Sequence, residues 1–414
     1  MTRILSLAFT FALAPAMPAA DWPQFLGPSR DGQCTETKLD WNWPKEGPPV
    51  AWKKDVGTGW AGPVVAGDAL VLFHRVGNDE VVAVLDPATG REKWSTKYVT
   101  KYRDDFDFDN GPRATPLIAD GKVFTLGANG DLHAWELTGG KKLWGRKIRD
   151  DYRAAKGFFG IACSPILVDK KILVNVGGEG AGVVAFDPAS GKELWKATSD
   201  AGSYSSPTAA EIDGKLAAVF LTRFGLRVLD PANGKVLYEL PWRPRLEASV
   251  QAATPIIWKD EIFLTVSYSQ GAVVVKAKGG ELTEVWPNKN RLTMGNDRTL
   301  SSQYNTPVRV GDYLYGVHGR SDGAAAQLRC VEWKTGAVKW SEQNFGVASL
   351  IAVDGGVLAL TEGGELVRFD ATTEGYKERG RATILSKPTR AAPALADGRL
   401  FARDGSKLIC VKLK

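Results

Sequence analysis

The sequence predicts an all-β fold, an eight-bladed β-propeller built from four-stranded antiparallel blades. One strand–turn–strand phrase recurs along the chain at a nearly constant spacing, and a second phrase precedes each copy of it. The composition agrees, because 45 glycines and 14 tryptophans among 414 residues indicate many tight turns around repeated aromatic positions rather than a helical bundle.

The first 20 residues have the order of a secretory signal peptide, in which Arg3 precedes an apolar run that is followed by small residues and prolines. That run is too short to span a bilayer, and no later stretch reads as a transmembrane helix. Cleavage is expected after Ala16 or near Ala20. The sequence thus predicts a periplasmic or secreted protein, with a lead segment over residues 21–49.

The first recurring phrase places a small residue, an acid, a glycine and an aromatic side chain at fixed positions. A strand ends in Asp-Pro, the proline begins a turn, the glycine supplies a positive φ, and the next strand carries the aromatic ring. Its copies read VLDPATGREKW at 84–94, AWELTGGKKLW at 134–144, AFDPASGKELW at 185–195, VLDPANGKVLY at 228–238 and, more weakly, CVEWKTGAVKW at 330–340. Trp144 and Trp195 are expected to be buried between adjacent blades. Trp22, Trp41 and Trp43 lie outside the repeat and are expected to contribute less to stability.

The second phrase is a proline followed by apolar alternation and a turn, which is typical of a hairpin of two short strands. Two hairpins per repeat give four antiparallel strands, and the aromatic positions recur at about 48 residues, a spacing that suits propeller blades. Eight copies of the second phrase begin at residues 63, 116, 165, 207, 255, 307, 350 and 393, and the copy at 350 lacks the proline.

The two ends of the repeat region are expected to close the ring. The eighth repeat has only three strands before the chain stops, whereas VAWKK at 50–54 is an outer strand with no blade of its own. A shared eighth blade leaves no unpaired edge, so residues 50–414 are expected to form one propeller domain. In the seventh repeat Tyr376 is out of register, and an irregular outer strand is expected there.

The phrase AFDPASGKELW resembles the tryptophan docking motif of the PQQ-like, or quinoprotein-type, eight-bladed propellers, and the resemblance runs from about Trp52 to Lys414. In size the chain is most similar to BamB-like exported propellers, and it is more distantly similar to the pyrroloquinoline quinone (PQQ) alcohol dehydrogenases. The resemblance implies a fold rather than a function, because the motif holds blades together. The chain lacks the adjacent cysteine pair of many such dehydrogenases and the lipid-attachment cysteine of BamB.

Charge and residue types exclude several functions. The net charge is only +6 with no basic run, which disfavours nucleic-acid binding. His74, His133 and His318 lack the spacing of metal ligands, and no nucleophile setting supports a hydrolytic triad. Cys330 and Cys410 occupy the small position of the first phrase, so they are interpreted as packed side chains.

An acidic stretch, RDDFDFDNG at 103–111, contains a candidate cation site made of Asp105, Asp107 and Asp109. In an extended segment these carboxylates would share one side, as calcium ligands require, while Phe106 and Phe108 would pack on the propeller. The alternative is a solvated acidic loop paired with local arginine or lysine.

The residue three places before each second-phrase proline is predicted to lie at the mouth of the central channel, because propeller symmetry sets equivalent positions on one ring. Two arginines and three aromatic residues at these positions suit a planar anionic ligand such as PQQ. The alternative is a purely structural plug. The five candidates are Trp60, Arg113, Tyr204, Tyr304 and Arg390.

The short loops and the lack of a catalytic cluster favour an exported, monomeric and non-catalytic propeller. It would act as a binding or scaffold module for a protein or a cell-envelope glycan partner, with no established cofactor. The alternative is a PQQ-dependent oxidoreductase acting on an alcohol or a sugar. There the quinone would carry the hydride chemistry, and the protein would supply a carboxylate base and calcium.

Overall fold

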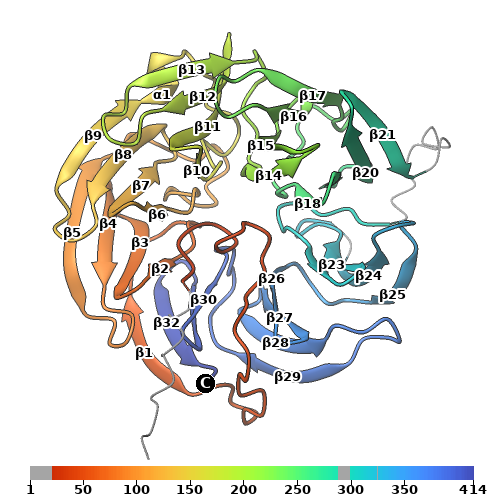
Figure 1. Ribbon diagram of the computed structural model, residues 1–414. Helices are drawn as coiled ribbons and strands as arrows, with labels where there is room; N and C mark the ends of the chain where they lie inside the picture. Colours follow the sequence, from red (N-terminus) through yellow and green to blue (C-terminus); the bar gives the residue numbers. More distant parts are fainter. Residues whose placement is uncertain (1–20, 288–298, 324) are drawn as a thin grey trace, which may run out of the picture.

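The computed structural model describes residues 21–287, 299–323 and 325–414. The expected signal peptide lies outside these ranges. Eight four-stranded antiparallel sheets surround a central axis as the blades of a propeller, which confirms the predicted fold (Figure 1). In the described ranges the one α-helix is the short α1 (Ile148–Asp151), and no helix there is long and apolar enough to cross a membrane.

Blades one to four each take four consecutive strands, from the innermost strand outward. They consist of β2 (Val64–Ala66), β3 (Ala69–Val76), β4 (Asp79–Leu85) and β5 (Glu92–Val99); β6 (Leu117–Ala119), β7 (Lys122–Leu126), β8 (Asp131–Glu136) and β9 (Lys142–Lys147); β10 (Ile166–Val168), β11 (Lys171–Gly178), β12 (Ala181–Phe186) and β13 (Glu193–Ala197); and β14 (Thr208–Ile212), β15 (Lys215–Leu221), β16 (Gly225–Leu229) and β17 (Val236–Pro241).

Blades five to seven repeat this order, and the eighth blade joins the two ends of the described chain. They consist of β18 (Ile256–Trp258), β19 (Glu261–Val266), β20 (Gly271–Lys278) and β21 (Glu281–Trp286); β22 (Val308–Val310), β23 (Tyr313–His318), β24 (Gln327–Glu332) and β25 (Val338–Glu342); β26 (Ala348–Val353), β27 (Gly356–Thr361), β28 (Glu365–Asp370) and β29 (Glu378–Thr383); and β30 (Ala394–Ala396), β31 (Arg399–Arg403), β32 (Lys407–Lys412) and β1 (Val50–Asp55).

Ring closure follows the prediction, because β1 pairs with β32 as the outer strand of blade eight. Blade seven does not follow it. Its outer strand β29 is six residues long and pairs regularly with β28, except for the irregularity next to the turn that other blades share. The expectation of an irregular strand was wrong because the aromatic ring is displaced rather than lost. Tyr376 packs against Trp340, Phe345 and Phe369, with ring centroids 5.5 to 6.1 Å apart.

A tryptophan on the outermost strand of one blade docks on the hairpin turn of the next blade. The Trp144 indole N–H donates to the Pro188 carbonyl at 3.1 Å, and the ring lies against Gly191, whose φ is +71°. A Cβ atom at Gly191 would lie 2.6 Å from Trp144 Cε3, so the turn accepts the ring only because glycine stands there. The same indole-to-carbonyl bond joins Trp52 to Pro87, Trp94 to Leu137, Trp195 to Pro231, Trp286 to Trp333 and Trp340 to Thr372.

These docking tryptophans differ in burial. Trp144 is 9% exposed, as predicted, whereas Trp195 is only half-buried, so its expected full burial was wrong. Blade four carries Tyr238 at this position, and its hydroxyl donates to Asp213 Oδ2 at 2.9 Å within the same blade.

The lead segment runs along the inner ends of the blades, from blade one to blade seven (Figure 1). Trp22 pairs with Val65 of blade one, and Gln33 pairs with Ala352 of blade seven. Between them the buried Arg30 guanidinium donates to the carbonyls of Ser164 and Pro165 in blade three, at 3.0 and 2.9 Å. The segment therefore ties together three blades that are not neighbours in sequence.

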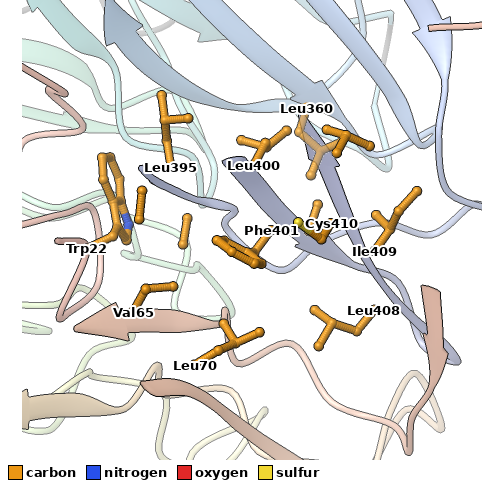
Figure 2. Packing of buried hydrophobic residues seen from close by; sticks show 14 of the residues in the cluster. Trp22, Val65, Leu70, Leu360, Leu395, Leu400, Phe401, Leu408, Ile409 and Cys410 are labelled. Carbon is orange, nitrogen blue, oxygen red and sulfur yellow. The ribbon is translucent and has the colours of Figure 1, made fainter. Parts of the chain in front are cut away.

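Trp22 corrects the expectation that the tryptophans of the lead segment matter less. It is 2% exposed and belongs to a large buried hydrophobic cluster with residues of blades one, seven and eight. Figure 2 shows it near Val65 of blade one and Leu395 of blade eight. The repeat analysis missed this contribution because Trp22 fills the inner ends of several blades without belonging to any of them.

A buried carboxyl group lies where blades one and two meet. Tyr98 Oη donates to Glu80 Oε2 at 2.5 Å, and the Ala128 backbone N–H donates to Glu80 Oε1 at 3.2 Å. Burial raises the pKa of Glu80 from 4.5 to about 7, and only part of that shift is offset by these two donors. His74 and His133 are shifted the other way, since burial lowers the pKa of these imidazoles to about 4 and about 3.

Replacing Trp144 by alanine should destabilise the protein by about 3–5 kcal/mol, because a large ring and its hydrogen bond leave an inter-blade contact. Gly191→Ala should also destabilise it, since the turn needs a positive φ and has no room for a methyl group. Urea denaturation followed by circular dichroism measures both effects. Leu143→Ala, at an exposed neighbour on β9, is the matched control. A loss below about 1 kcal/mol at Trp144 would contradict the docking role.

Stability should depend on Glu80 through pH. The folded-state pKa lies above the unfolded value, so its stabilising contribution is complete below about pH 4.5 and is lost as pH rises through about 7. The lowered pKa values of His74 and His133 oppose this trend over part of the pH range. The effect of Glu80 is therefore measured as the difference in unfolding free energy between the parent and Glu80→Gln. That difference should change by a few kcal/mol between pH 4.5 and 8, at about 1.4 kcal/mol per pKa unit. Urea unfolding at stepped pH tests it, and a pH-independent difference would contradict it.

Candidate functional site

A cavity of about 560 Å³ lies on the propeller axis, and residues that precede or begin the inner strands of all eight blades line it. The structure brings together all five residues predicted for the channel mouth. They are Trp60, Arg113, Tyr204, Tyr304 and Arg390. Their convergence follows from repeat symmetry, as expected. Ligand binding by these residues stays a prediction.

The cavity opens on the face where the inner strands begin. The five mouth residues all precede their inner strands, whereas the lead segment pairs with the inner strands themselves at Val65 and Ala352. Phe25 and Leu26 of the lead segment also line the cavity. The lead segment therefore forms part of the cavity wall.

Arg113 is a structural residue rather than a free anion-binding group. Its side chain is 3% exposed and forms an ion pair with the buried Asp104, with 3.1 Å between Nη2 and Oδ2. The guanidinium lies between the rings of Trp60 and Tyr102, 4.7 Å from each centroid. It also donates to the carbonyls of Asp109 and Gly111. These contacts satisfy most of its donors before any ligand arrives.

The other two arginines of the cavity also have carboxylate partners. Arg390 Nε lies 2.7 Å from Glu362 Oε1, and the guanidinium lies 4.9 Å from the Trp60 ring centroid. Arg320 Nη2 lies 2.6 Å from Asp322 Oδ2. Each arginine of the lining is already paired with a carboxylate, so the cavity has no unpaired positive charge to attract an anion. The expected preference for an anionic ligand rested on such a charge. Sequence reasoning missed Asp104 and Glu362 because neither occupies an equivalent position in the repeat.

Exposed aromatic side chains surround the mouth. Phe106 and Phe108 are 50% and 58% exposed, and their rings lie 6.1 Å apart. Phe159 lies 5.3 Å from Phe106 and extends the cluster toward Tyr204. The expectation that Phe106 and Phe108 pack on the propeller was wrong. They line the open cavity, where they leave apolar surface in water.

The three candidate cation ligands do not converge. Residues 105–108 form a turn and bend in which Asp107 has a φ of +54°, so the alternation of an extended strand does not apply. Asp105 pairs with Lys156 at 2.5 Å, and Asp109 accepts from the backbone amides of Gly59 and Gly111. No group of three or more His, Cys, Asp or Glu side chains in the described ranges could hold a metal ion. The geometry fits the alternative, an acidic loop with local partners.

Three polar atoms of the lining are buried without a hydrogen-bond partner in the described part of the chain, Arg113 Nε, Tyr304 Oη and Asn305 Oδ1. Burial raises the pKa of Tyr304, so its hydroxyl is protonated at neutral pH. Tyr204 differs, because its Oη accepts from the backbone amides of Phe158 and Phe159 at 2.8 and 3.2 Å. The Arg113 guanidinium is enclosed between the rings of Trp60 and Tyr102, which leaves Tyr304 and Asn305 as the residues whose polar atoms a ligand would satisfy.

A partial belt of four hydroxyl groups joins neighbouring blades at the floor of the cavity, and sequence reasoning missed it. Each belt residue stands directly before a second-phrase proline, and its oxygen accepts from the backbone amide at the same position of the preceding blade. The bonds run from Gly62 to Thr115, Thr115 to Ser164, Ser164 to Ser206, and Thr254 to Thr306, at 2.9 to 3.1 Å. The signal was present, since serine or threonine recurs before five of the prolines.

The cysteines supply no redox pair. Cys34, Cys163, Cys330 and Cys410 are all free thiols in the described ranges. Cys330 and Cys410 are fully buried in their blades, as the repeat alignment predicts. Burial raises the pKa of the Cys330 thiol to about 11 and that of Cys410 to about 12, so both stay neutral.

Arg113→Ala should destabilise the fold by about 3–5 kcal/mol, because it leaves the buried Asp104 carboxylate without its partner. The double variant Arg113→Leu with Asp104→Leu should recover much of that loss, since it removes both charges. Thermal unfolding of the two variants and the parent measures the difference. Equal stability of Arg113→Ala and the parent would show that the pair is not structural.

Comparison with known proteins places these features in a family. A family model described as outer membrane protein assembly factor BamB matches residues 78–342. The crystal structure of BamB from Moraxella catarrhalis is similar, with a TM-score of 0.62 and 14% identity over 88% of this chain and 97% of that chain. No curated protein matches the sequence.

Two further solved structures share the architecture. A quinohemoprotein alcohol dehydrogenase from Comamonas testosteroni has a TM-score of 0.68 and 14% identity over 95% of this chain and 80% of that chain. The computationally designed Ika8 protein has a TM-score of 0.57 and 14% identity over 88% of this chain and all of that chain. These likenesses show the fold alone. The family match covers more than half of the sequence, and so the chain belongs to the PQQ-like propeller family whose model is described as outer membrane protein assembly factor BamB.

Proposed function

We propose that this protein is an exported, non-catalytic binding propeller, whose axial cavity and aromatic mouth take a ligand or a partner. One observation carries the proposal. The cavity leaves several aromatic rings open to solvent, while every arginine that lines it is already paired with a carboxylate. A concave site with apolar walls and a few polar groups is typical of binding sites.

The export part of the proposal rests on the signal-like residues 1–20. The binding part rests on the mouth. Binding of a partner over exposed rings of this size is favourable, because it removes apolar surface from water.

The residues fit the oxidoreductase alternative poorly. PQQ is a planar polycarboxylate, yet Arg113 and Arg390 already neutralise Asp104 and Glu362. The described residues also offer no group of carboxylates arranged to hold calcium beside it. Neither the charge nor the metal ligands that such chemistry needs are gathered at this cavity.

The experiment that separates the two functions combines PQQ titration with a dye-linked oxidation assay. The purified protein is incubated with PQQ and calcium, and alcohols and aldoses are supplied as substrates. We expect no PQQ-dependent turnover and no change in the visible spectrum of PQQ. Turnover that requires PQQ, and that falls in Arg390→Ala, would overturn the non-catalytic proposal.

The cavity itself is tested by ligand-dependent shifts in melting temperature with panels of sugars, short peptides and planar carboxylates. We expect one class to stabilise the parent protein, and the shift to disappear in Phe106→Ala with Phe108→Ala. A shift that survives the double variant would place the binding site elsewhere.

A further inference from the structure

The lining of the axial cavity is balanced in charge. Arg113, Arg320 and Arg390 are its cations, and each has a carboxylate within 3.1 Å. A polyanion would have to compete with these carboxylates, and a cation would have to compete with the arginines. The cavity therefore favours a ligand with no net charge.

The lining is also divided into two chemically unlike parts. The mouth presents aromatic faces, chiefly Phe106 and Phe108, which attract C–H groups through the negative face of the ring. The floor presents the hydroxyls of Ser164, Ser206 and Thr306 and the amide of Asn305. A ligand that fits both parts must carry an apolar face and many neutral polar groups.

Tyr304 Oη and Asn305 Oδ1, which have no hydrogen-bond partner in the described residues, further restrict the chemistry of the ligand. Asn305 Oδ1 can only accept a hydrogen bond, whereas Tyr304 Oη can donate one and accept others. A buried polar atom without a partner is unfavourable, and a wholly apolar ligand would leave both atoms unpaired. A ligand hydroxyl is suited to both positions because it donates and accepts at once.

We propose that the ligand of this cavity is a neutral saccharide, whose rings stack on the phenylalanines of the mouth while its hydroxyls bond to Tyr304 and Asn305. The proposal rests on the proposed function, since it names the ligand class of the same cavity. The volume of about 560 Å³ lies within the range of small-molecule sites.

An extended peptide is the main competing ligand, and the inner strands argue against it. Peptides that bind propeller-like or sheet-edge sites by strand addition need a run of free backbone groups. The inner strands next to Asn305, β18 and β22, are only three residues long each. The cavity thus offers side-chain hydroxyls and rings, the groups that recognise a sugar, more than it offers a strand edge.

The test is isothermal titration calorimetry of the full protein, with saturation-transfer NMR, using cellobiose, maltose, xylobiose and chitobiose as probes. At least one disaccharide should bind. Tyr304→Phe, which removes one oxygen and keeps the ring, should weaken it up to about tenfold, the loss of one hydrogen bond. Phe106→Ala with Phe108→Ala should weaken it by at least as much. NMR should show saturation transfer to the sugar C–H protons in the parent but not in the double phenylalanine variant.

Phe224→Ala is the matched control, because Phe224 is 46% exposed and does not line the cavity. Its affinity should equal that of the parent, and the melting temperatures of all variants show whether they fold. Failure of every disaccharide to bind overturns the saccharide assignment, as does binding that survives Tyr304→Phe and the double phenylalanine change. If a peptide or PQQ binds in the cavity instead, the ligand class is wrong but the cavity remains the binding site. PQQ-dependent turnover would overturn the proposed function itself.

Discussion

The fold depends on a hydrogen bond between blades, from a tryptophan indole N–H to a carbonyl in the hairpin turn of the next blade. Trp144 and Pro188 form it at 3.1 Å, and five other tryptophans repeat it around the ring. The turn glycine makes the contact possible by holding a positive φ and leaving room for the ring. Because every copy points from one blade to the following blade, the contact fixes both the order and the spacing of the blades. This regular spacing of the blades places the lining residues evenly around the cavity.

Sequence reasoning recovered the parts of the molecule that symmetry repeats. The strand phrases gave eight blades and the shared closing blade, since turn chemistry and period-two alternation are local properties. The same symmetry brought Trp60, Arg113 and Arg390 to one cavity despite their separation in the chain. Residues at equivalent positions of a ring need no knowledge of side-chain packing to be placed together.

What the repeat could not predict are the contacts that break its symmetry. Asp104 and Glu362 neutralise the arginines from positions that have no equivalents in other blades. Asp107 takes a positive φ, which turns the acidic stretch away from an extended strand and separates its carboxylates. Trp22 is buried across several blades, so no period reveals it. These features arise from long-range packing, which a single sequence does not disclose.

The pairing of β1 with β32 has a consequence for the order of events during folding. Lys407 reaches back to Asp55, 352 residues earlier in the chain, so the ring is held shut by one of the most distant contacts the chain can make. Loop-closure entropy opposes such a contact until most of the blades have formed. A ribosome must release residues 407–412 before β1 has a strand partner, and Arg390 and Ala392 of the same blade complete the wall of the axial cavity. A protein made this way completes the wall of its axial cavity only when its last blade folds.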